Sequence, residues 1–335
     1  MTDTTIPETA SILADRAHYL ITAAGRAPSV HNTQPWRFRV DRSAIELYCD
    51  PRRKLAKDPA GREMLISCGA ALFGLRLGVR SLGYRPVVEL LPDPARLRLL
   101  ARVSLGAEEP ISRVEYQMLA ALPHRHTHRG PFRPGPLPSG LLAGLQHDAL
   151  AEGATLVLIE PGIAYERLAD IANAVNRRLD QDPQTQAETR QWSRGPASPA
   201  RDGVPAHAYP STTAPAMPRR GRGRLPQRDF DLGRGWGEQD AGGPPPAVTA
   251  ALVTSGDSRA DWLRAGQALH RLLAHAATNW VFASLNTQLL EITLIRALIR
   301  DRLALPGAPQ MLLQLGVVDT THPTGRRPPE ELIEP

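Results

Sequence analysis

The segment at residues 27–36, APSVHNTQPW, holds a dense set of hydrogen-bonding side chains in a stretch that cannot form a regular helix. Pro28 and Pro35 bracket it, because proline fixes its own backbone torsion and lacks an N–H group. Ser29 and Asn32 lie between them, and such residues favour turns that present backbone and side-chain donors. The pattern favours a loop that contacts the polar edge of a flat ring. An elaborate helix-to-strand turn, anchored in the core by its tryptophan, is the alternative interpretation.

A second segment, RHTHRGPF at residues 125–132, suits the binding of an anion. Side chains alternate between the two faces of an extended chain, so Arg125, Thr127 and Arg129 are expected on one face. Two guanidinium groups and a hydroxyl then offer donors whose geometry matches phosphate oxygens. A surface loop of salt bridges is the alternative.

Three histidines interleave with this second segment, namely His124, His126 and His128. Histidines can bind zinc, but no thiol or carboxylate is suitably spaced nearby, and we therefore predict no metal site. A ligand with a flat heterocycle at one end and a phosphate at the other would satisfy both segments.

Composition limits the remaining classes of function. The chain has 335 residues, of which 42% are apolar, enough for a core in one large or two ordinary domains. Its net charge is +6 and its isoelectric point is near 9.8. The positive charge is almost entirely arginine and is spread along the chain, so we predict no nucleic-acid partner. The sequence has no GxSxG elbow, no P-loop and no complete GxGxxG fingerprint, which argues against serine hydrolases and the common nucleotide-binding folds.

The two cysteines, Cys49 and Cys68, form no CxxC pair and are too few for a disulfide framework. They favour a reducing compartment. The first twenty residues have early acidic side chains and no uninterrupted apolar run, unlike a signal peptide or membrane anchor. We therefore expect a cytoplasmic protein without a membrane partner.

Hydrophobic periodicity predicts alternating helices and strands around the two segments. The first half is expected to contain a helix, a hairpin, a long helix rich in small residues and a strand, at residues 9–24, 36–40 with 44–49, 61–82 and 86–91. The second half is expected to contain helices at 137–151, 163–180 and 261–277 and strands at 155–160 and 248–254. These elements fit an α+β arrangement in which helices pack across one sheet.

A weak internal repeat accompanies this order of elements. Residues 69–72 read GAAL in the first long helix, and residues 266–269 read GQAL in the second. The match is short, but the similar order of helices and strands around it favours a duplication.

Residues 191–246 differ from the rest, because proline, glycine and arginine dominate and apolar periodicity is nearly absent. Loops of this length in a compact domain are usually lids, binding loops or disordered insertions. An arginine-glycine run within it could also contact single-stranded RNA, but it lacks regular repetition.

Several motifs together resemble the FMN-dependent nitroreductase superfamily. The pattern PSxxNxQPW before a strand and the later R-x-T-x-R segment resemble that family in general. More closely, APSVHNTQPWRF, GREMLISCGAAL, DWLRAGQALHRLL, PQMLLQLG and the RRP-containing tail resemble its Acg-like branch, in the expected order over most of the chain outside residues 191–246.

This resemblance implies a nitroreductase-like fold and one FMN per chain. Nitroreductases are usually homodimers with flavin at the subunit interface, and the Acg-like branch imitates that dimer with two halves of one polypeptide. The resemblance thus implies halves at residues 1–115 and 116–335, with a lid-like insertion at about 191–246, and favours a monomer over a homodimer. The implied FMN-binding residues are Pro28, Ser29 and Asn32 at the ring, Arg125, Thr127 and Arg129 at the phosphate, and Arg326 or Arg327 as a further phosphate ligand.

The family also places a donor near flavin N5, in the segment that here holds Ser284, Asn286 and Thr287. This segment lacks the usual glycine, which puts that contact in doubt. The implied activity is transfer of hydride from NADH or NADPH through FMN to a nitroaromatic, a quinone or a similar small acceptor, with no catalytic side chain required. The alternative is an FMN storage or sequestering protein, in which the insertion covers the flavin. The sequence does not distinguish the two nicotinamides or identify the acceptor.

Overall fold

The computed structural model describes residues 12–209, 225–236 and 246–334. Most strands belong to two four-stranded antiparallel sheets rather than the single sheet expected. The first has the order β1-β2-β4-β3, with β1 (Trp36–Val40), β2 (Ile45–Cys49), β3 (Tyr84–Leu90) and β4 (Leu99–Glu108). The second has the order β5-β8-β10-β9, with β5 (Thr155–Leu158), β8 (Val248–Thr254), β9 (Val281–Leu285) and β10 (Ala308–Val317).

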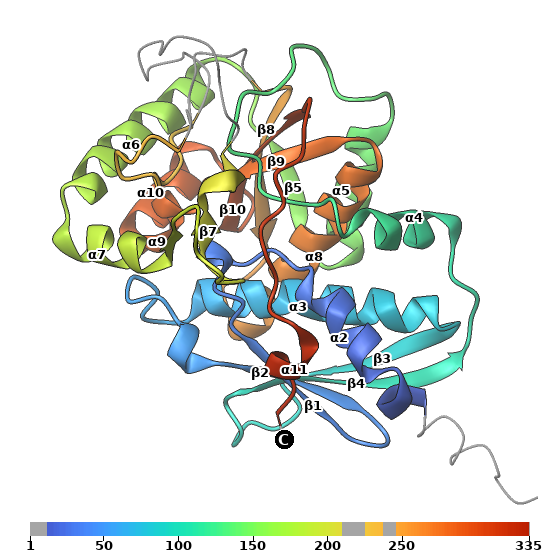
Figure 1. Cartoon of the computed structure of the whole chain (residues 1–335). Helices are drawn as coiled ribbons and strands as arrows, with labels where there is room; N and C mark the ends of the chain where they lie inside the picture. The colour runs from blue at the N-terminus through green and yellow to red at the C-terminus, as the bar shows by residue number, and fades with distance from the viewer. Residues whose placement is uncertain (1–11, 210–224, 237–245, 335) are drawn as a thin grey trace, which may run out of the picture.

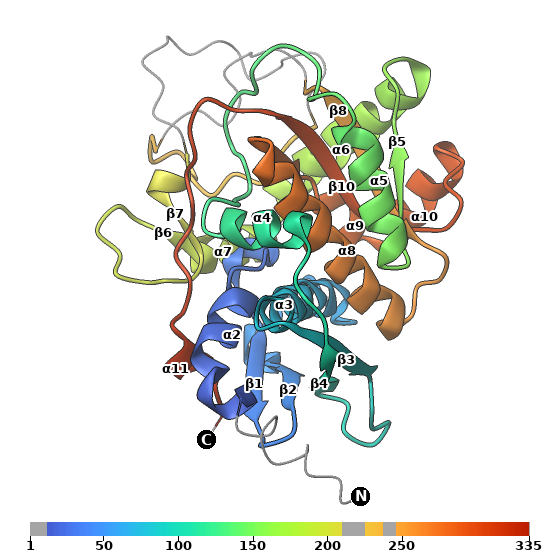
Figure 2. The same cartoon turned by 90° about the vertical axis from the view of Figure 1, so that its right-hand side faces the viewer.

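The two sheets have the same topology in chain order: first, second, fourth and third strand. In each, one helix of 20 residues connects the second strand to the third, α3 (Arg62–Ser81) in the first unit and α8 (Arg259–Thr278) in the second. Figures 1 and 2 show these two helices packed together between the sheets. Outside this layer, α2 (Ala17–Gly25) packs on α3, while α4 (Arg113–Ala121) and α5 (Leu141–Ala151) pack on α8.

The contact between α3 and α8 depends on two glycines. A Cβ atom on Gly69 would overlap the carbonyl of Leu263, and one on Gly266 would overlap the carbonyl of Ile66. Each glycine thus faces the residue three positions before the other glycine. Such reciprocal contacts are typical of two-fold symmetry. The small residues of α3 do permit the close helix approach that the sequence indicates.

Substituting Gly266→Ala should lower the free energy of unfolding by about 1–3 kcal/mol, because the methyl group has to displace helix backbone rather than a flexible side chain. Urea denaturation followed by circular dichroism measures this loss. Gly195→Ala is the matched control, because its added Cβ would meet nothing within 4 Å. Equal stability of the two variants would contradict the close crossing.

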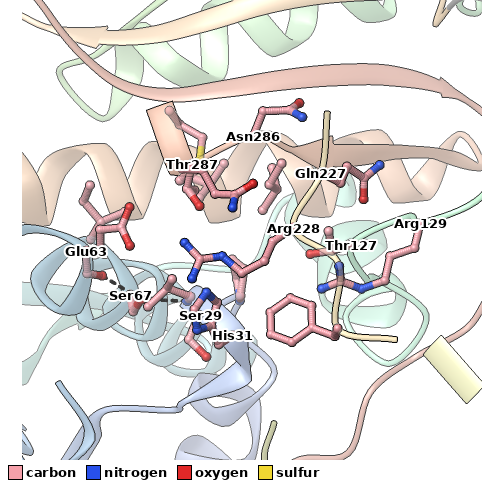
Figure 3. A pocket seen from close by; sticks show the side chains of 18 residues that line it. Ser29, His31, Glu63, Ser67, Thr127, Arg129, Gln227, Arg228, Asn286 and Thr287 are labelled. Carbon is pink, nitrogen blue, oxygen red and sulfur yellow. Dashed lines mark hydrogen bonds between the residues drawn. The ribbon is translucent and has the colours of Figure 1, made fainter. Parts of the chain in front are cut away.

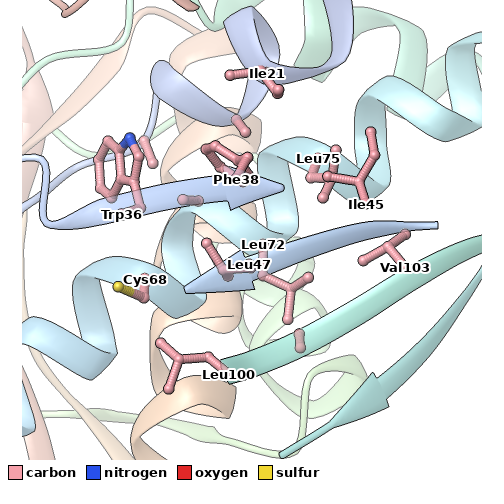
Figure 4. Packing of buried hydrophobic residues seen from close by; sticks show 14 of the residues in the cluster. Ile21, Trp36, Phe38, Ile45, Leu47, Cys68, Leu72, Leu75, Leu100 and Val103 are labelled. Carbon is pink, nitrogen blue, oxygen red and sulfur yellow. The ribbon is translucent and has the colours of Figure 1, made fainter. Parts of the chain in front are cut away.

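The apolar core follows the layers. In the first unit, Trp36, Phe38, Ile45 and Leu47 of the hairpin pack against α3, as Figure 4 shows. In the second unit, β8 and β10 are buried along nearly their whole length. One face of that sheet packs on α8, and the other packs on helices that include α6 (Ile163–Asp180), α9 (Gln288–Glu291) and α10 (Thr293–Arg302).

The C-terminal tail returns from the second sheet to the first. It leaves β10 and ends in α11 (Pro329–Leu332), which packs on α2 (Figure 1). The Glu334 N–H donates to the Phe38 carbonyl at 2.7 Å, which fixes the tail beside β1. Residues near 326 are thereby brought close to the loop that follows α2.

Residues 191–246 lie between β5 and β8, where the first unit has only the tight turn between β1 and β2. Their described parts include the parallel pair β6 (Ser193–Arg194) and β7 (Val204–Pro205) and the short 3-10 helix Ala206–Ala208. The arginine-glycine run at residues 219–224 is outside the described residues. The segment is therefore an insertion into one hairpin of the second unit.

The α+β class is confirmed, as are the hairpin, both long helices, the helix at 163–180 and the strand at 248–254. The helix predicted at 137–151 begins only at Leu141, because two prolines precede it. The helix predicted at 9–24 extends to Gly25, and its start lies outside the described residues. The elements missed by the sequence interpretation include β4, β9, β10, α4, α7 (Pro183–Trp192) and α10.

Among the described residues, α3 alone is long and apolar enough to span a membrane, but 83% of its apolar window is buried inside the structure. Its apolarity therefore matches its place in the core.

Candidate functional site

A pocket lies where the two sheet-and-helix units meet. Its volume is about 740 Å³, including space open to solvent at its mouth. Six of the residues predicted from sequence line the pocket, and they come from segments far apart in the chain (Figure 3): Pro28, Ser29, Thr127, Arg129, Asn286 and Thr287.

The loop after α2 has an unusual backbone. His31, Asn32 and Gln34 have φ angles of 50°, 55° and 50°, in the left-handed region that residues other than glycine seldom adopt. Hydrogen bonds hold this shape: the Gln34 N–H donates to Ser29 Oγ at 3.0 Å, and the Val30 N–H donates to Ser67 Oγ on α3 at 3.3 Å. Strain of this kind persists where surrounding contacts impose it, often at binding sites.

Asn32 does not line the pocket but joins three segments beside it. Its amide nitrogen donates to the carbonyls of Gly203 at 2.9 Å and Gly325 at 3.1 Å. Its side-chain oxygen accepts from Arg326 Nη1 at 3.0 Å. The side chain therefore fixes the insertion and the C-terminal tail against the loop.

His31 is a pocket residue that the sequence interpretation did not assign. Its ring is buried, and neither ring nitrogen has a partner within the described part of the chain. Burial, followed by the positive charges of Arg228 and Arg129, holds its pKa well below the ordinary value. The neutral ring packs edge-on against Phe230, with centroids 5.0 Å apart.

The 125–129 segment lies along the edge of the second sheet. Thr127 pairs with Ala283 of β9 in a parallel bridge, and the His128 N–H donates to the Ala283 carbonyl at 2.8 Å. This pairing places Thr127 and Arg129 at the pocket. His126 packs on Phe282, and no group of three potential metal ligands occurs among residues 12–209, 225–236 and 246–334.

Three arginines gather near the pocket with no counter-charge among the described residues: Arg26, Arg125 and Arg326, which we term the arginine cluster. Arg125 is 4% exposed, and its Nε and Nη1 atoms have no partner among the described residues. Burial and the nearby Arg26 lower its pKa to about 10. Burial, Arg125 and Arg26 likewise lower the pKa of Arg326. No carboxylate in the described part of the chain forms an ion pair with any of the three.

Buried cations are costly unless paired, and each normally has an anion or a full set of hydrogen bonds. Arg326 Nη1 donates only to neutral oxygens, of Asn32, Thr324 and Gly325. Its Nε atom is buried, with no acceptor in the described residues. The arginine cluster therefore has the chemistry of an anion site.

Arg129 and Arg327 occupy different surroundings. Arg129 lies over the rings of Tyr209 and Phe230, at 5.6 Å and 5.2 Å from their centroids, and lines the pocket. Arg327 forms an ion pair within the C-terminal tail, because its Nε donates to the Glu331 carboxylate at 3.0 Å. The structure thus separates Arg327 from the pocket-lining set.

The end of β9 and the residues that follow it contribute polar groups with no partner in the described structure. Ser284 Oγ and the side-chain oxygen of Asn286 are buried and unpartnered there, while the Asn286 amide donates to the Pro226 carbonyl at 2.9 Å. Thr287 lies on the pocket wall just before α9.

Part of the insertion crosses the pocket; we term residues 225–230 the strap. Its Gln227, Arg228 and Phe230 line the pocket. Arg228 donates from Nη2 to both carboxylate oxygens of the buried Glu291, at 2.7 Å and 2.9 Å. This buried ion pair fastens the strap to the second unit, and sequence alone gives no signal that these two residues meet.

Comparison with known proteins places this chain in a family. No family model matches the chain. A Mycobacterium tuberculosis protein named "Putative NAD(P)H nitroreductase Rv3131" is 33% identical over 330 residues, which cover 96% of this chain and 92% of that protein. The chain belongs to the nitroreductase family.

Within the nitroreductases, this chain is Acg-like. It is 26% identical to "Putative NAD(P)H nitroreductase acg" of M. tuberculosis, over 98% of both chains. It is also 28% identical to "Uncharacterized protein Rv3127" of that organism, over 93% of this chain and 90% of the other. The matches thus extend over nearly the whole of this chain. As a nitroreductase, the chain is an oxidoreductase of the NAD(P)H-dependent kind.

Proposed function

We propose that this nitroreductase binds one FMN per chain in the pocket between its two units and passes hydride from NADH or NADPH to a small acceptor such as a nitroaromatic or a quinone. The observation that carries the proposal is the arginine cluster. A phosphate monoester would supply a negative charge to the buried Arg125 and the half-buried Arg26 and Arg326. The unpartnered donors of Arg125 and Arg326 are the first candidates to receive it.

The residues at the pocket fit the remainder of FMN. Ser29 and the strained loop provide polar groups on one wall, and Asn286 and Thr287 provide them on the facing segment. Ser284 Oγ and the side-chain oxygen of Asn286 have no partner in the described structure. In a complex with the ligand, the serine hydroxyl would donate or accept a hydrogen bond and the asparagine oxygen would accept one. FMN, when bound, would supply the hydride chemistry. The protein's part is to orient the ring, to hold the phosphate and to leave space for the second substrate.

We also propose that residues 1–115 and 116–335 are two nitroreductase-like halves that form a pseudo-dimer within one chain. Three features support this: the identical strand order of the sheets, the equivalent 20-residue helices and the reciprocal contacts of Gly69 and Gly266. An internal interface of this kind makes a partner chain unnecessary, which favours a monomer.

A second hollow, lined by residues that include Val88 and Leu90, supports the count of one flavin per chain. If the two halves are aligned so that Gly69 corresponds to Gly266, Val88 and Leu90 correspond to Leu285 and Thr287 of the main pocket. The hollow is therefore the place where a symmetric second site would lie. Arg76 lines this hollow and donates hydrogen bonds from Nη1 to Glu152 at 2.5 Å and to Gln267 at 2.8 Å. These polar groups of the hollow are therefore already hydrogen-bonded to one another.

Flavin storage is the second candidate function, favoured by the strap. The buried pair of Arg228 and Glu291 holds residues 225–230 across the pocket. If the strap stays in place over bound FMN, nicotinamide would be excluded; if it opens, it gates substrate entry.

The visible spectrum of the purified protein tests the proposal, because bound FMN colours it yellow. Anaerobic mixing with NADH and with NADPH should then bleach the flavin, and a quinone should restore the colour. Yellow protein that neither nicotinamide bleaches would favour storage. Colourless protein that fails to bind added FMN would overturn the flavin assignment.

A further inference from the structure

Glu63 brings a carboxyl group into the pocket that the proposed function does not use. It lies in the first turn of α3 and is 4% exposed. Its Oε2 atom is buried without a partner among the described residues, and its Oε1 atom accepts one long hydrogen bond from Arg62, at 3.3 Å. Arg62 also donates hydrogen bonds to the backbone and side-chain oxygens of Gln310 and to the Leu290 carbonyl.

The charges around Glu63 come from several elements: Asp58 before α3, Arg62 beside it, Arg228 on the strap, Glu291 on α9 and Arg296 on α10. Burial and the nearby negative charge of Glu291 raise the pKa of Glu63 well above its ordinary value, while Arg62 and Arg228 oppose this shift. Arg228 donates to both oxygens of Glu291 and so favours its charged form, whereas Glu63 receives only one long hydrogen bond from Arg62. Of the two carboxyl groups, Glu63 therefore has the surroundings that favour the protonated form more strongly.

The backbone of Glu63 is linked through Ser67 to the neighbouring loop that follows α2. Ser67 Oγ donates to the Glu63 carbonyl at 2.7 Å and accepts from the Val30 N–H at 3.3 Å. Figure 3 shows Glu63, Ser67 and Ser29 side by side at the pocket, with Arg228 nearby. Ser67 thus joins the start of α3, which carries Glu63, to the loop at the pocket.

We propose that Glu63 donates its proton to an oxygen atom of the electron acceptor in this pocket, a role that rests on the proposed reductase function. A quinone gains a hydride equivalent that originates from NAD(P)H and becomes the hydroquinone anion. The O–H bond of Glu63 breaks as its proton joins that anion's oxygen, giving the neutral hydroquinone. The Glu63 carboxylate then recovers a proton from water. Nitro groups, whose oxygens also require protons on reduction, fall in the same substrate class.

Replacing Glu63→Gln keeps the shape and removes the transferable proton. With FMN-loaded protein and p-benzoquinone in anaerobic stopped flow, bleaching by NADPH or NADH should proceed as in the wild type. Re-oxidation by the quinone should be slower by about 10²–10⁴-fold, the usual contribution of a general acid. The wild-type re-oxidation rate should fall as pH rises through the pKa of Glu63, whereas the variant's rate should not. Glu166→Gln, an exposed first-turn carboxyl on α6, is the matched control.

A second readout needs no activity: the thermal stability of both proteins without flavin, from pH 5 to pH 8. An unfolded chain releases the Glu63 proton above about pH 4.5, whereas the folded wild type retains it. The wild type should therefore lose stability relative to Glu63→Gln as pH rises. A stability difference independent of pH would show that Glu63 is ionised and would overturn the proposal.

The two half-reactions separate the possible failures. If the wild type binds no flavin or is not bleached by either nicotinamide, the proposed reductase function fails and the role of Glu63 fails with it. If the wild type completes the cycle and Glu63→Gln re-oxidises equally fast, only the role of Glu63 is overturned. A variant that loses FMN affinity but re-oxidises at the wild-type rate also overturns it.

Discussion

Arg125→Met should raise the stability of the flavin-free protein and, at the same time, weaken FMN binding by about tenfold to 150-fold. The side chain is 4% exposed, and only its Nη2 atom has a partner in the described structure, the Arg26 carbonyl at 3.2 Å. A flexible apolar side chain removes a buried charge and two unsatisfied donors, each of which costs about 1–3 kcal/mol. The loss of binding corresponds to one charge-assisted hydrogen bond of about 1.5–3 kcal/mol.

Opposite changes in stability and affinity distinguish a ligand-binding arginine from a structural one. Thermal unfolding without flavin and fluorescence titration with FMN measure the two quantities. Arg133→Met is the control, because Arg133 is 59% exposed and pairs with Asp319 at the surface. Arg125→Met protein that is less stable and still binds FMN normally would assign Arg125 to the framework instead.

Arg228→Met should destabilise the protein by about 3–5 kcal/mol, because it leaves the Glu291 carboxylate buried without its partner. Burial already raises the pKa of Glu291, and Arg228 opposes that shift. Without Arg228, Glu291 can relieve its charge by taking up a proton, so the loss should be larger at pH 8 than at pH 5. Denaturant unfolding at the two pH values measures this.

The double variant Arg228→Met/Glu291→Gln should recover most of that stability, since it removes both charges together. Arg300→Met is the control, because the pair of Arg300 and Asp301 is half exposed or more at both ends. FMN should also associate faster with Arg228→Met than with the wild type, because the strap is no longer fastened. A loss within about 0.5 kcal/mol would show that the ion pair does not hold the strap.

The parts of the fold set by local patterns were predictable from the sequence. The hairpin of β1 and β2 follows from two alternating runs around a turn, and α6 follows from its apolar spacing. Two strands of the second sheet, β9 and β10, were not predicted; β10 is buried over nearly all its length and its apolar run carries no alternation. Glycines at the helix crossing were recognisable as small residues, but their reciprocal contact depends on tertiary packing.

Part of the candidate site was likewise predictable from the sequence. The segments at residues 27–36 and 125–132 were recognisable as motifs, and six of the residues named from them or from the family resemblance meet at one pocket. Arg228, His31 and Glu63 were not assigned, because their significance comes from burial and from partners more than 60 residues away or from unmet hydrogen bonds. The positive φ angles at His31, Asn32 and Gln34 have only a weak signature in sequence, since Asn and His adopt them more often than most residues but far less often than glycine.

Titration of the full-length protein with FMN and, separately, with riboflavin tests the central claim most directly, because riboflavin has the same ring and no phosphate. The arginine cluster predicts saturation at one FMN per chain, with riboflavin binding at least about 10²-fold more weakly, since several charge-assisted contacts are lost. Equal affinity for the two flavins, saturation at two FMN per chain, or no binding of either would contradict a single flavin site built around Arg125 and Arg326.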